Sequence, residues 1–237
     1  MYNKETLQSY ASFSEILKLL KRDLSFNKYC SQQRITKGST FLFDENMNTC
    51  YLLESGYVKN NYISEALGSN GPQIAYITSS GNLINLPLLI EERPKKYEIV
   101  ALTDVIWWKI DFDYIRKILL TEDPKNFIIF HFALETRNQL FTLLKKYSLS
   151  KKNSIYYSLL SLVTYGIQIK ENQVELPLFI TYDILADLSF ASKTYTSEVL
   201  KDLRKAGILL SSKKPWIITD IHGLKNLIDV PYLVDLV

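Results

Sequence analysis

The side chains with the clearest chemical potential are cations and hydroxyls gathered between residues 192 and 216. Six basic residues stand there against two acidic ones, which gives this stretch a net charge of +4 in a chain of only +3. Neutralising the phosphates of a nucleic acid requires such a local excess of lysine and arginine. Because the rest of the chain is nearly neutral, the sequence predicts that any nucleic-acid contact lies in this segment.

The helix signals around this stretch follow a specific order. Thr181 can cap a short helix, a turn over 189–191 follows, and Ser192 can cap a second helix that runs to Ala206. Gly207 stands where a left-handed C-cap is expected. The residues beyond it predict a strand at 208–210, a polar tip at 211–215 and a second strand at 216–219. Two helices joined by a short turn and followed by a two-stranded wing are typical of a winged helix-turn-helix.

The second of these helices has two chemically different faces. Its inward stripe consists of Thr196, Val199, Leu200 and Leu203. The opposite face carries groups that can contact phosphates and base edges. We therefore predict a DNA-binding set made of Ser192, Lys193, Thr194, Tyr195, Ser197, Glu198 and Lys201 on the helix, with Lys213 and Lys214 on the wing. The alternative is a solvated charged helix in another kind of α+β domain.

A long helix is predicted from about 125 to 148, with Pro124 near its first turn. It carries two apolar seams at three- and four-residue spacing, whereas a surface helix needs only one. The seams are Ile129, Ala133, Thr136, Leu140, Leu143 and Tyr147, and Phe130, Leu134, Arg137, Phe141 and Leu144. The second seam predicts contact with a symmetric partner helix, unless both are buried within one domain. The predicted dimerisation residues are Ile129, Ala133, Leu140, Phe141 and Leu144.

Upstream of this helix, short apolar or alternating runs recur at intervals of roughly ten residues. The runs are TFLF, CYLLE, YVKNNYI, IAYITS, YEIVAL and VIWWKI, and GSNGP at 68–72 predicts a hairpin turn. Short strands in this arrangement predict a compact all-β roll or barrel. Helices are expected before and after it, over 12–24 with Ser12 and Glu15 as a capping-box pair, and over 111–121 with Asp111 or Asp113 as the cap.

These elements predict an α+β chain of three parts. Residues 1–124 form a β-roll sensor domain with an N-terminal helix, 125–148 a dimerisation helix, and 149–237 a winged helix-turn-helix domain. A polar break at 148–152 and a helix over 153–165 that ends at Gly166, a predicted C-cap, mark the start of the last part.

Composition removes several classes of protein. With 47% apolar and 22% charged residues among 237, the chain has the make-up of a folded globular protein. Cys30 and Cys50 are the only cysteines and His131 and His222 the only histidines, so we expect no disulfide framework, no metal and no cofactor. No nucleophile elbow, GxGxxG, P-loop or HExxH motif indicates an enzyme. Without a signal peptide or a long apolar run, the sequence predicts a cytoplasmic protein that makes no membrane contact.

From about residue 12 to 230 the chain resembles the Crp/Fnr family of bacterial transcription regulators, and its PrfA-like branch more than its cyclic-AMP receptor branch. The strongest match is ASKTYTSEVLKDLRKAGIL, with weaker support from the glycines in LLESGYVKN, SSGNLI and KGSTFLF. The resemblance implies a cyclic-nucleotide-binding-like β-roll (jelly roll) and a homodimer on an inverted repeat of double-stranded DNA, with RNA polymerase as a further partner of an activator. It places base reading at Lys193, Thr194 and Glu198, although many members have a guanine-reading arginine where this chain has Glu198.

The chain departs from the family in the segment that holds a cyclic nucleotide. The family's ribose-binding glutamate falls near Leu86, and its phosphate-binding arginine falls near Lys95 or Lys96. Because the chain lacks a carboxylate and a guanidinium at these positions, we expect no cyclic-nucleotide binding.

Other modes of regulation stay open on the sequence alone. A different effector would bind between the roll and the long helix, with Tyr62, Tyr76, Lys59 and Lys96 as its polar contacts. Cys30 and Cys50 are either redox sensors or buried small hydrophobes. An alternative function is a small-molecule-binding signalling protein whose C-terminal domain contacts protein rather than DNA.

Overall fold

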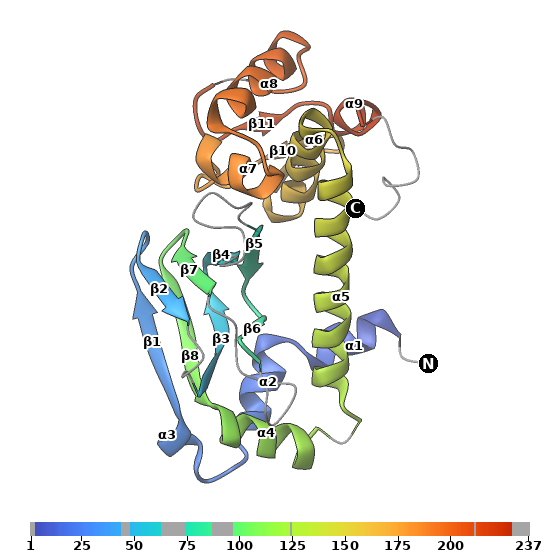
Figure 1. The fold of residues 1–237 in the computed structure, drawn as a ribbon. Helices are drawn as coiled ribbons and strands as arrows, with labels where there is room; N and C mark the ends of the chain where they lie inside the picture. Colours follow the sequence, from blue (N-terminus) through green and yellow to red (C-terminus); the bar gives the residue numbers. More distant parts are fainter. Residues whose placement is uncertain are drawn as a thin grey trace. The chain divides into compact units, whose positions relative to one another are not determined.

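The computed structural model describes residues 3–43, 48–62, 74–86, 97–123, 125–210 and 212–228. The chain forms two compact units, and the main division falls between Gln139 and Leu140, inside the long helix α5 (Phe127–Ser148) (Figure 1). Among the helices of the described ranges, none combines the length and the hydrophobicity that crossing a membrane requires.

Two four-stranded sheets form the roll of the first unit. One has the strand order β1-β8-β3-β6, with bounds β1 (Cys30–Ile35), β8 (Val105–Asp111), β3 (Thr49–Ser55) and β6 (Leu83–Ile84). The other has the order β2-β7-β4-β5, with bounds β2 (Thr40–Phe43), β7 (Tyr97–Ala101), β4 (Tyr57–Tyr62) and β5 (Ile74–Ser79). The six predicted strands are confirmed. The sequence analysis missed β1, which is largely polar, and β6, which is only two residues long; the predicted turn at 68–72 lies outside the described residues.

Strand β3 shows why its sequence is apolar without alternation. Neighbouring residues of a strand point to opposite faces of the sheet. Leu52 belongs to a core shared with Ile110 and the flanking helices, whereas Leu53 belongs to a core shared with Ile99 and Trp107 of the two sheets. Both leucines are fully buried, and burial of such a side chain contributes about 2 kcal/mol. Both faces of β3 are therefore covered, which the run CYLLE requires.

Gly56 makes the tight turn between β3 and β4. Its φ of +93° lies in the left-handed region, and a Cβ at this position would stand 2.8 Å from the Thr103 Oγ1 atom. A side chain at this position would both strain the backbone and collide with its neighbour. The glycine in LLESGYVKN is therefore a requirement of the roll.

The helices that follow the roll begin at aspartates. Asp111 accepts hydrogen bonds from two amides at the start of α4 (Phe112–Thr121), which confirms it as the predicted cap. Asp123 accepts from the amides of Phe127 at 3.0 Å and Ile128 at 2.9 Å. Helix α5 consequently begins two residues later than predicted, and Pro124 lies outside the described residues.

The N-terminal helices differ from the prediction. The helix expected over 12–24 ends at Leu20 as α2 (Phe13–Leu20), and Leu24 is fully exposed instead of joining the apolar stripe. Ser12 precedes α2, but its hydroxyl contacts Ser14 rather than a backbone amide, so no capping box forms. Two short helices, α1 (Lys4–Tyr10) and α3 (Phe26–Tyr29), were not predicted.

The two cysteines lie on either side of β8. Cys30 of β1 and Cys50 of β3 are both paired with Ile110, so their backbones are two strand spacings apart, roughly 10 Å. A disulfide needs Cα atoms within about 7 Å of each other. Burial also raises the pKa of the Cys30 thiol to about 12 and that of Cys50 further. The arrangement contradicts a Cys30–Cys50 disulfide switch and favours buried small hydrophobes.

The second unit contains most of the remaining helices and a small sheet. Its elements are α6 (Lys151–Leu162), η2 (Val163–Tyr165), β9 (Ile167–Lys170), β10 (Gln173–Glu175), α7 (Tyr182–Ser189), α8 (Lys193–Lys205), β11 (Ile217–Ile218) and α9 (Ile221–Asn226). The sheet order is β11-β10-β9, in which β9 and β10 were not predicted. The strand expected at 208–210 is reduced to one bridge between Leu209 and Ile218.

Gly166 serves a different purpose from the predicted one. It follows the helical segment, but its φ of −84° is extended, so it is not a left-handed C-cap. A Cβ on this residue would stand 2.7 Å from the carbonyl oxygen of Glu175 in β10. The glycine therefore permits close approach of two backbone segments.

Lys146 is a buried cation near the end of α5. It is 5% exposed, and burial lowers the pKa of its amine from 10.5 to about 8. We expect Lys146→Met to raise the free energy of unfolding at pH 7 by about 2 kcal/mol, because no charge then has to be desolvated. The advantage should shrink between about pH 8 and 10.5, where only the unfolded wild-type chain still binds the proton. Urea unfolding of both proteins at pH 7 and pH 10 measures this, and equal stabilities at pH 7 would contradict it.

Candidate nucleic-acid interface

Helix α7 begins and ends with local signals that set its direction. The Thr181 side chain accepts a hydrogen bond from the amide of Ile184 at 3.1 Å, which confirms the predicted cap. Asp183 lies in the first turn, where a negative charge suits the helix dipole. Phe190 ends the helix in the left-handed conformation, with a φ of 54°. The chain therefore turns sharply before α8.

Helix α8 follows the prediction closely. The Ser192 hydroxyl accepts a hydrogen bond from the amide of Tyr195 at 3.2 Å, and Gly207 has a φ of +75° beyond the C-terminus. The predicted inward stripe is buried throughout: Thr196, Val199, Leu200 and Leu203. Arg204 donates a hydrogen bond to the hydroxyl of Tyr182 at 2.7 Å, which joins α8 to the start of α7. These contacts fix which face of α8 is turned outward.

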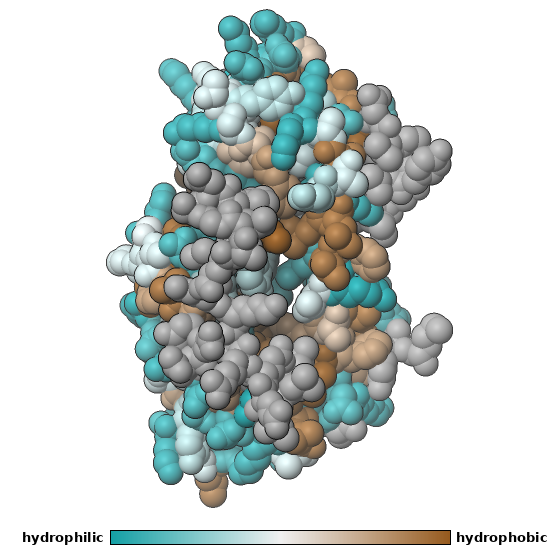
Figure 2. Space-filling view, viewed as in Figure 1, coloured by the Kyte–Doolittle hydropathy of each residue, from teal (hydrophilic) through white to brown (hydrophobic). Residues whose placement is uncertain are grey.

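The predicted DNA-binding residues all lie on the exposed side of the second unit. On α8 and its cap these are Ser192, Lys193, Thr194, Tyr195, Ser197, Glu198 and Lys201; on the segment before β11 they are Lys213 and Lys214. Figure 2 shows mainly hydrophilic side chains over α8 in this view. The Nζ atom of Lys214 approaches the carbonyl oxygen of Leu178 at 3.5 Å. The exposed groups are hydroxyls, cations and one carboxylate, which are suited to phosphates and base edges.

Two ion pairs modify the charge of this surface. Lys193 Nζ lies 2.9 Å from the Oδ1 atom of Asp183, and Lys205 Nζ lies 3.6 Å from the Oδ1 atom of Asp202. Asp183 was not among the predicted DNA-binding residues. Its contact with Lys193 joins two helices and could not be found from spacing along either one.

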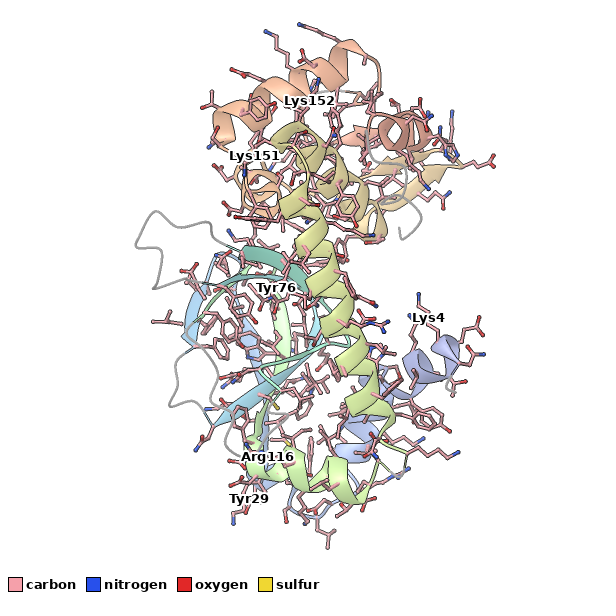
Figure 3. All side chains as sticks on the ribbon, turned by 45° about the vertical axis from the view of Figure 1, so that its right-hand side comes forward. Lys4, Tyr29, Tyr76, Arg116, Lys151 and Lys152 are labelled. Atoms are coloured by element: carbon pink, nitrogen blue, oxygen red, sulfur yellow. The ribbon has the colours of Figure 1, made fainter. Side chains whose placement is uncertain are left out.

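The start of α6 lies beside the turn before α8. Ser154 donates a hydrogen bond to the carbonyl of Ser189 at 2.9 Å, and Ser158 donates to that of Leu188 at 3.1 Å. Lys151 and Lys152 occupy the first turn of α6, where they are exposed and no acidic residue accompanies them (Figure 3). These two lysines were not among the predicted contacts, and a cation in the first turn of a helix is unfavourable for the helix dipole.

The exposed apolar residues of α5 form a single stripe. Its apolar members are Phe130, Ala133, Leu140, Leu144 and Tyr147, with the charged Arg137 at the remaining position of the alternating three- and four-residue spacing and Phe141 beside them. The stripe takes residues from both predicted seams. The side facing the roll core instead presents Ile128 and Phe132, with Ile129 partly buried against the same core. Ile129 of the predicted dimerisation set is therefore partly covered by its own unit, and its contact with a partner stays a prediction.

The predicted effector contacts do not gather on one face. Tyr62 stacks with Tyr76 at 6.1 Å and packs on Tyr97 at 5.4 Å between ring centroids. Lys59 lies three residues before Tyr62 in β4 and so points to the opposite face of the sheet. Lys96, like Lys95, lies outside the described residues. Leu86 packs against the core between the first sheet and the helices.

A buried polar pair accompanies the tyrosines. The Asn60 side chain, fully buried, donates a hydrogen bond to the Thr78 hydroxyl at 2.8 Å, and its own carbonyl oxygen has no partner among the described residues. Burial raises the pKa of Tyr76 and Tyr97. Within the described ranges, no three His, Cys, Asp or Glu side chains gather as a metal site would require.

Comparison with known proteins supplies the fold. No family model matches the chain. The HTH-type transcriptional regulator ArcR of Staphylococcus epidermidis is 24% identical over 201 residues, which cover 83% of this chain and 85% of that protein. A cyclic nucleotide-binding domain containing protein from Listeria monocytogenes has a TM-score of 0.71 at 21% identity, over 86% of this chain and 96% of its own. A CRP/FNR family transcriptional regulator from Thermus thermophilus has a TM-score of 0.64 at 18% identity, over 84% of this chain and 98% of that protein.

The structural likenesses extend over most of the chain and of each solved protein. This chain itself has the two-sheet roll, the long α5 and the α7–α8 pair with its small sheet. The chain therefore has the α+β fold of the CRP/FNR regulators, with a cyclic-nucleotide-binding-like β-roll, a long helix and a helix-turn-helix.

Proposed function

We propose that this chain is a sequence-specific DNA-binding transcription regulator that acts as a homodimer on an inverted repeat. The outer face of α8 supports the proposal most directly. It presents Lys193, Thr194, Ser197, Glu198 and Lys201 opposite a fully buried stripe, on a helix capped at both ends. A helix of this kind fits the major groove, and exposed lysines of the neighbouring segment reach phosphates.

The roles within the interface follow from chemistry. Lys193 and Thr194 read base edges near the N-terminus of α8, and Glu198 accepts a hydrogen bond from the amino group of a cytosine. Ser192 and Tyr195 hydroxyls donate to phosphates, while Lys201, Lys213 and Lys214 neutralise them. These assignments agree with the exposure of every residue named.

The α5 stripe supports the dimer. Alternating three- and four-residue spacing is the geometry by which two helices pack in a coiled coil. Two copies of α8 related by a two-fold axis would enter successive major grooves about one helical turn apart. The resulting operator is an inverted repeat, as the resemblance implies.

Regulation differs from that of cyclic-nucleotide-dependent members. Leu86 is an apolar residue packed in a core, where the ribose-binding carboxylate of the family is expected. We propose that the chain works without a cyclic nucleotide. Three further points stay predictions: the likeness to the PrfA-like branch, the cytoplasmic location, and RNA polymerase as a partner of an activating form.

Salt dependence of binding to random-sequence duplex DNA tests the proposal. A dimer that makes about six to eight lysine–phosphate contacts should give a straight line when the logarithm of the association constant is plotted against the logarithm of the salt concentration. The slope of that line should lie between about −5 and −7. Fluorescence anisotropy between 50 and roughly 300 mM salt measures it. A signalling protein whose C-terminal domain contacts protein would show no such dependence, and a flat response would overturn the DNA-binding proposal.

A further inference from the structure

We infer that Asp183 restrains Lys193 and thereby lowers the attraction of the α8 surface for DNA of any sequence. The inference rests on the proposed function, because Lys193 is one of the residues assigned to base reading. It gives Asp183 a part in DNA affinity that the sequence pattern did not indicate.

The geometry places an anion directly on the DNA-binding cation. Lys193 is the first residue of α8 and Asp183 the second residue of α7, and their charged atoms are 2.9 Å apart. The two side chains are 64% and 62% exposed. The pair is therefore open to solvent and lies on the face that would meet the duplex.

The pair matters more for binding than for folding. An exposed ion pair contributes little to the stability of the fold. A lysine already neutralised by a neighbouring carboxylate, however, displaces fewer counterions when it approaches a phosphate. If Lys193 moves to DNA, Asp183 is left without its partner and close to the phosphate chain, where like charges repel.

The consequence is a difference between random and operator DNA. On random DNA, Lys193 gains only a phosphate contact, and the cost of breaking its pair with Asp183 nearly offsets that gain. On the operator, a hydrogen-bonded base edge adds about 1–3 kcal/mol, which compensates for breaking the pair. Because the pair must break in both cases, Asp183 lowers both affinities, and it lets Lys193 move to DNA chiefly where a base edge compensates for the break.

Asp183→Asn provides the test, because it removes the charge with little change in shape and leaves the Thr181 cap of α7 in place. Anisotropy titrations on random duplex DNA should show a salt-dependence slope that is steeper than the wild-type slope by about 1.8. Each dimer then has two more lysines, one per subunit, that are free to neutralise a phosphate. The affinity advantage of the variant over wild type should therefore grow about twelvefold between roughly 200 mM and 50 mM salt. Asp183→Glu keeps the charge and should behave as wild type, and thermal unfolding of each variant checks the fold.

Asp113→Asn is the matched control. Asp113 is also a first-turn aspartate with an exposed carboxylate, which pairs with Arg116 at 3.1 Å, but it lies on α4 of the first unit. The Asp113→Asn variant changes the net charge by the same amount as Asp183→Asn, and its salt-dependence slope should equal that of wild type. An identical slope for Asp183→Asn and Asp113→Asn would overturn the inference while leaving the proposed function intact.

A double-mutant cycle identifies the route of the effect. In a Lys193→Ala background, Asp183→Asn should no longer steepen the slope, because no lysine remains to be released. An unchanged gain in that background would mean general repulsion and would overturn the assigned pairing. Failure of the wild-type protein to bind duplex DNA at any salt concentration would overturn the proposed function and this inference with it.

Discussion

Replacing Lys193 and Lys201 together with alanine should weaken operator binding at least about 100-fold while leaving the dimer intact. Both residues are exposed on the outer face of α8, so their removal leaves no cavity and disturbs no core contact. A dimer loses four cationic contacts, of which two are in the base-reading region. The effect should be largest at low salt, where each lysine–phosphate contact contributes most.

Gel-shift titration with an operator recovered by selection from random duplexes measures this loss. Lys18→Ala with Lys28→Ala is the control, since these lysines lie on the helices that flank the roll and their removal changes the net charge equally. Sedimentation should give the same molecular mass for wild type, test variant and control. Operator affinity within about threefold of wild type in the test variant would contradict the assignment of α8 as the recognition helix.

The part of the interface that the sequence predicted is the part governed by local rules. Thr181, Ser192 and Gly207 act within one turn of their own helices, so residue type and spacing were sufficient to place them. The buried stripe of α8 follows from helical periodicity alone. The fold class was predictable for the same reason, because apolar residues recur with different periods in the strands of the roll and in the helices of the second unit.

Grouping Lys59 with Tyr62 overlooked a local rule, because residues three apart in a strand point to opposite faces. The other misjudgements arose where long-range packing decides. Ile129 and Leu144 fit apolar spacing equally well, and only the position of the roll core shows that Ile129 is partly buried within its own unit whereas Leu144 is exposed. The Asp183–Lys193 pair joins separate helices and leaves no periodic signal.

Leu144→Asp should convert the dimer into a folded monomer. Leu144 lies on the exposed apolar stripe of α5 and is 54% exposed in the single chain, so a carboxylate there is tolerated without a partner. In a dimer the same carboxylate would be buried opposite its own symmetry copy, which costs several kcal/mol in desolvation and repulsion. We expect the dimer dissociation constant to rise at least about 1,000-fold, and operator affinity to fall because two recognition helices no longer bind together.

Sedimentation equilibrium across a range of concentrations measures the dimer, and circular dichroism confirms that the monomer stays folded. Asn138→Asp is the matched control: it adds the same charge to the same helix at an exposed position about 120° around the axis from Leu144. If the stripe forms the interface, Asn138→Asp should remain dimeric with wild-type affinity for the operator. A Leu144→Asp protein that sediments as a dimer would show that the subunits associate through some other surface, and the spacing of the two half-sites would then have to be derived from that surface.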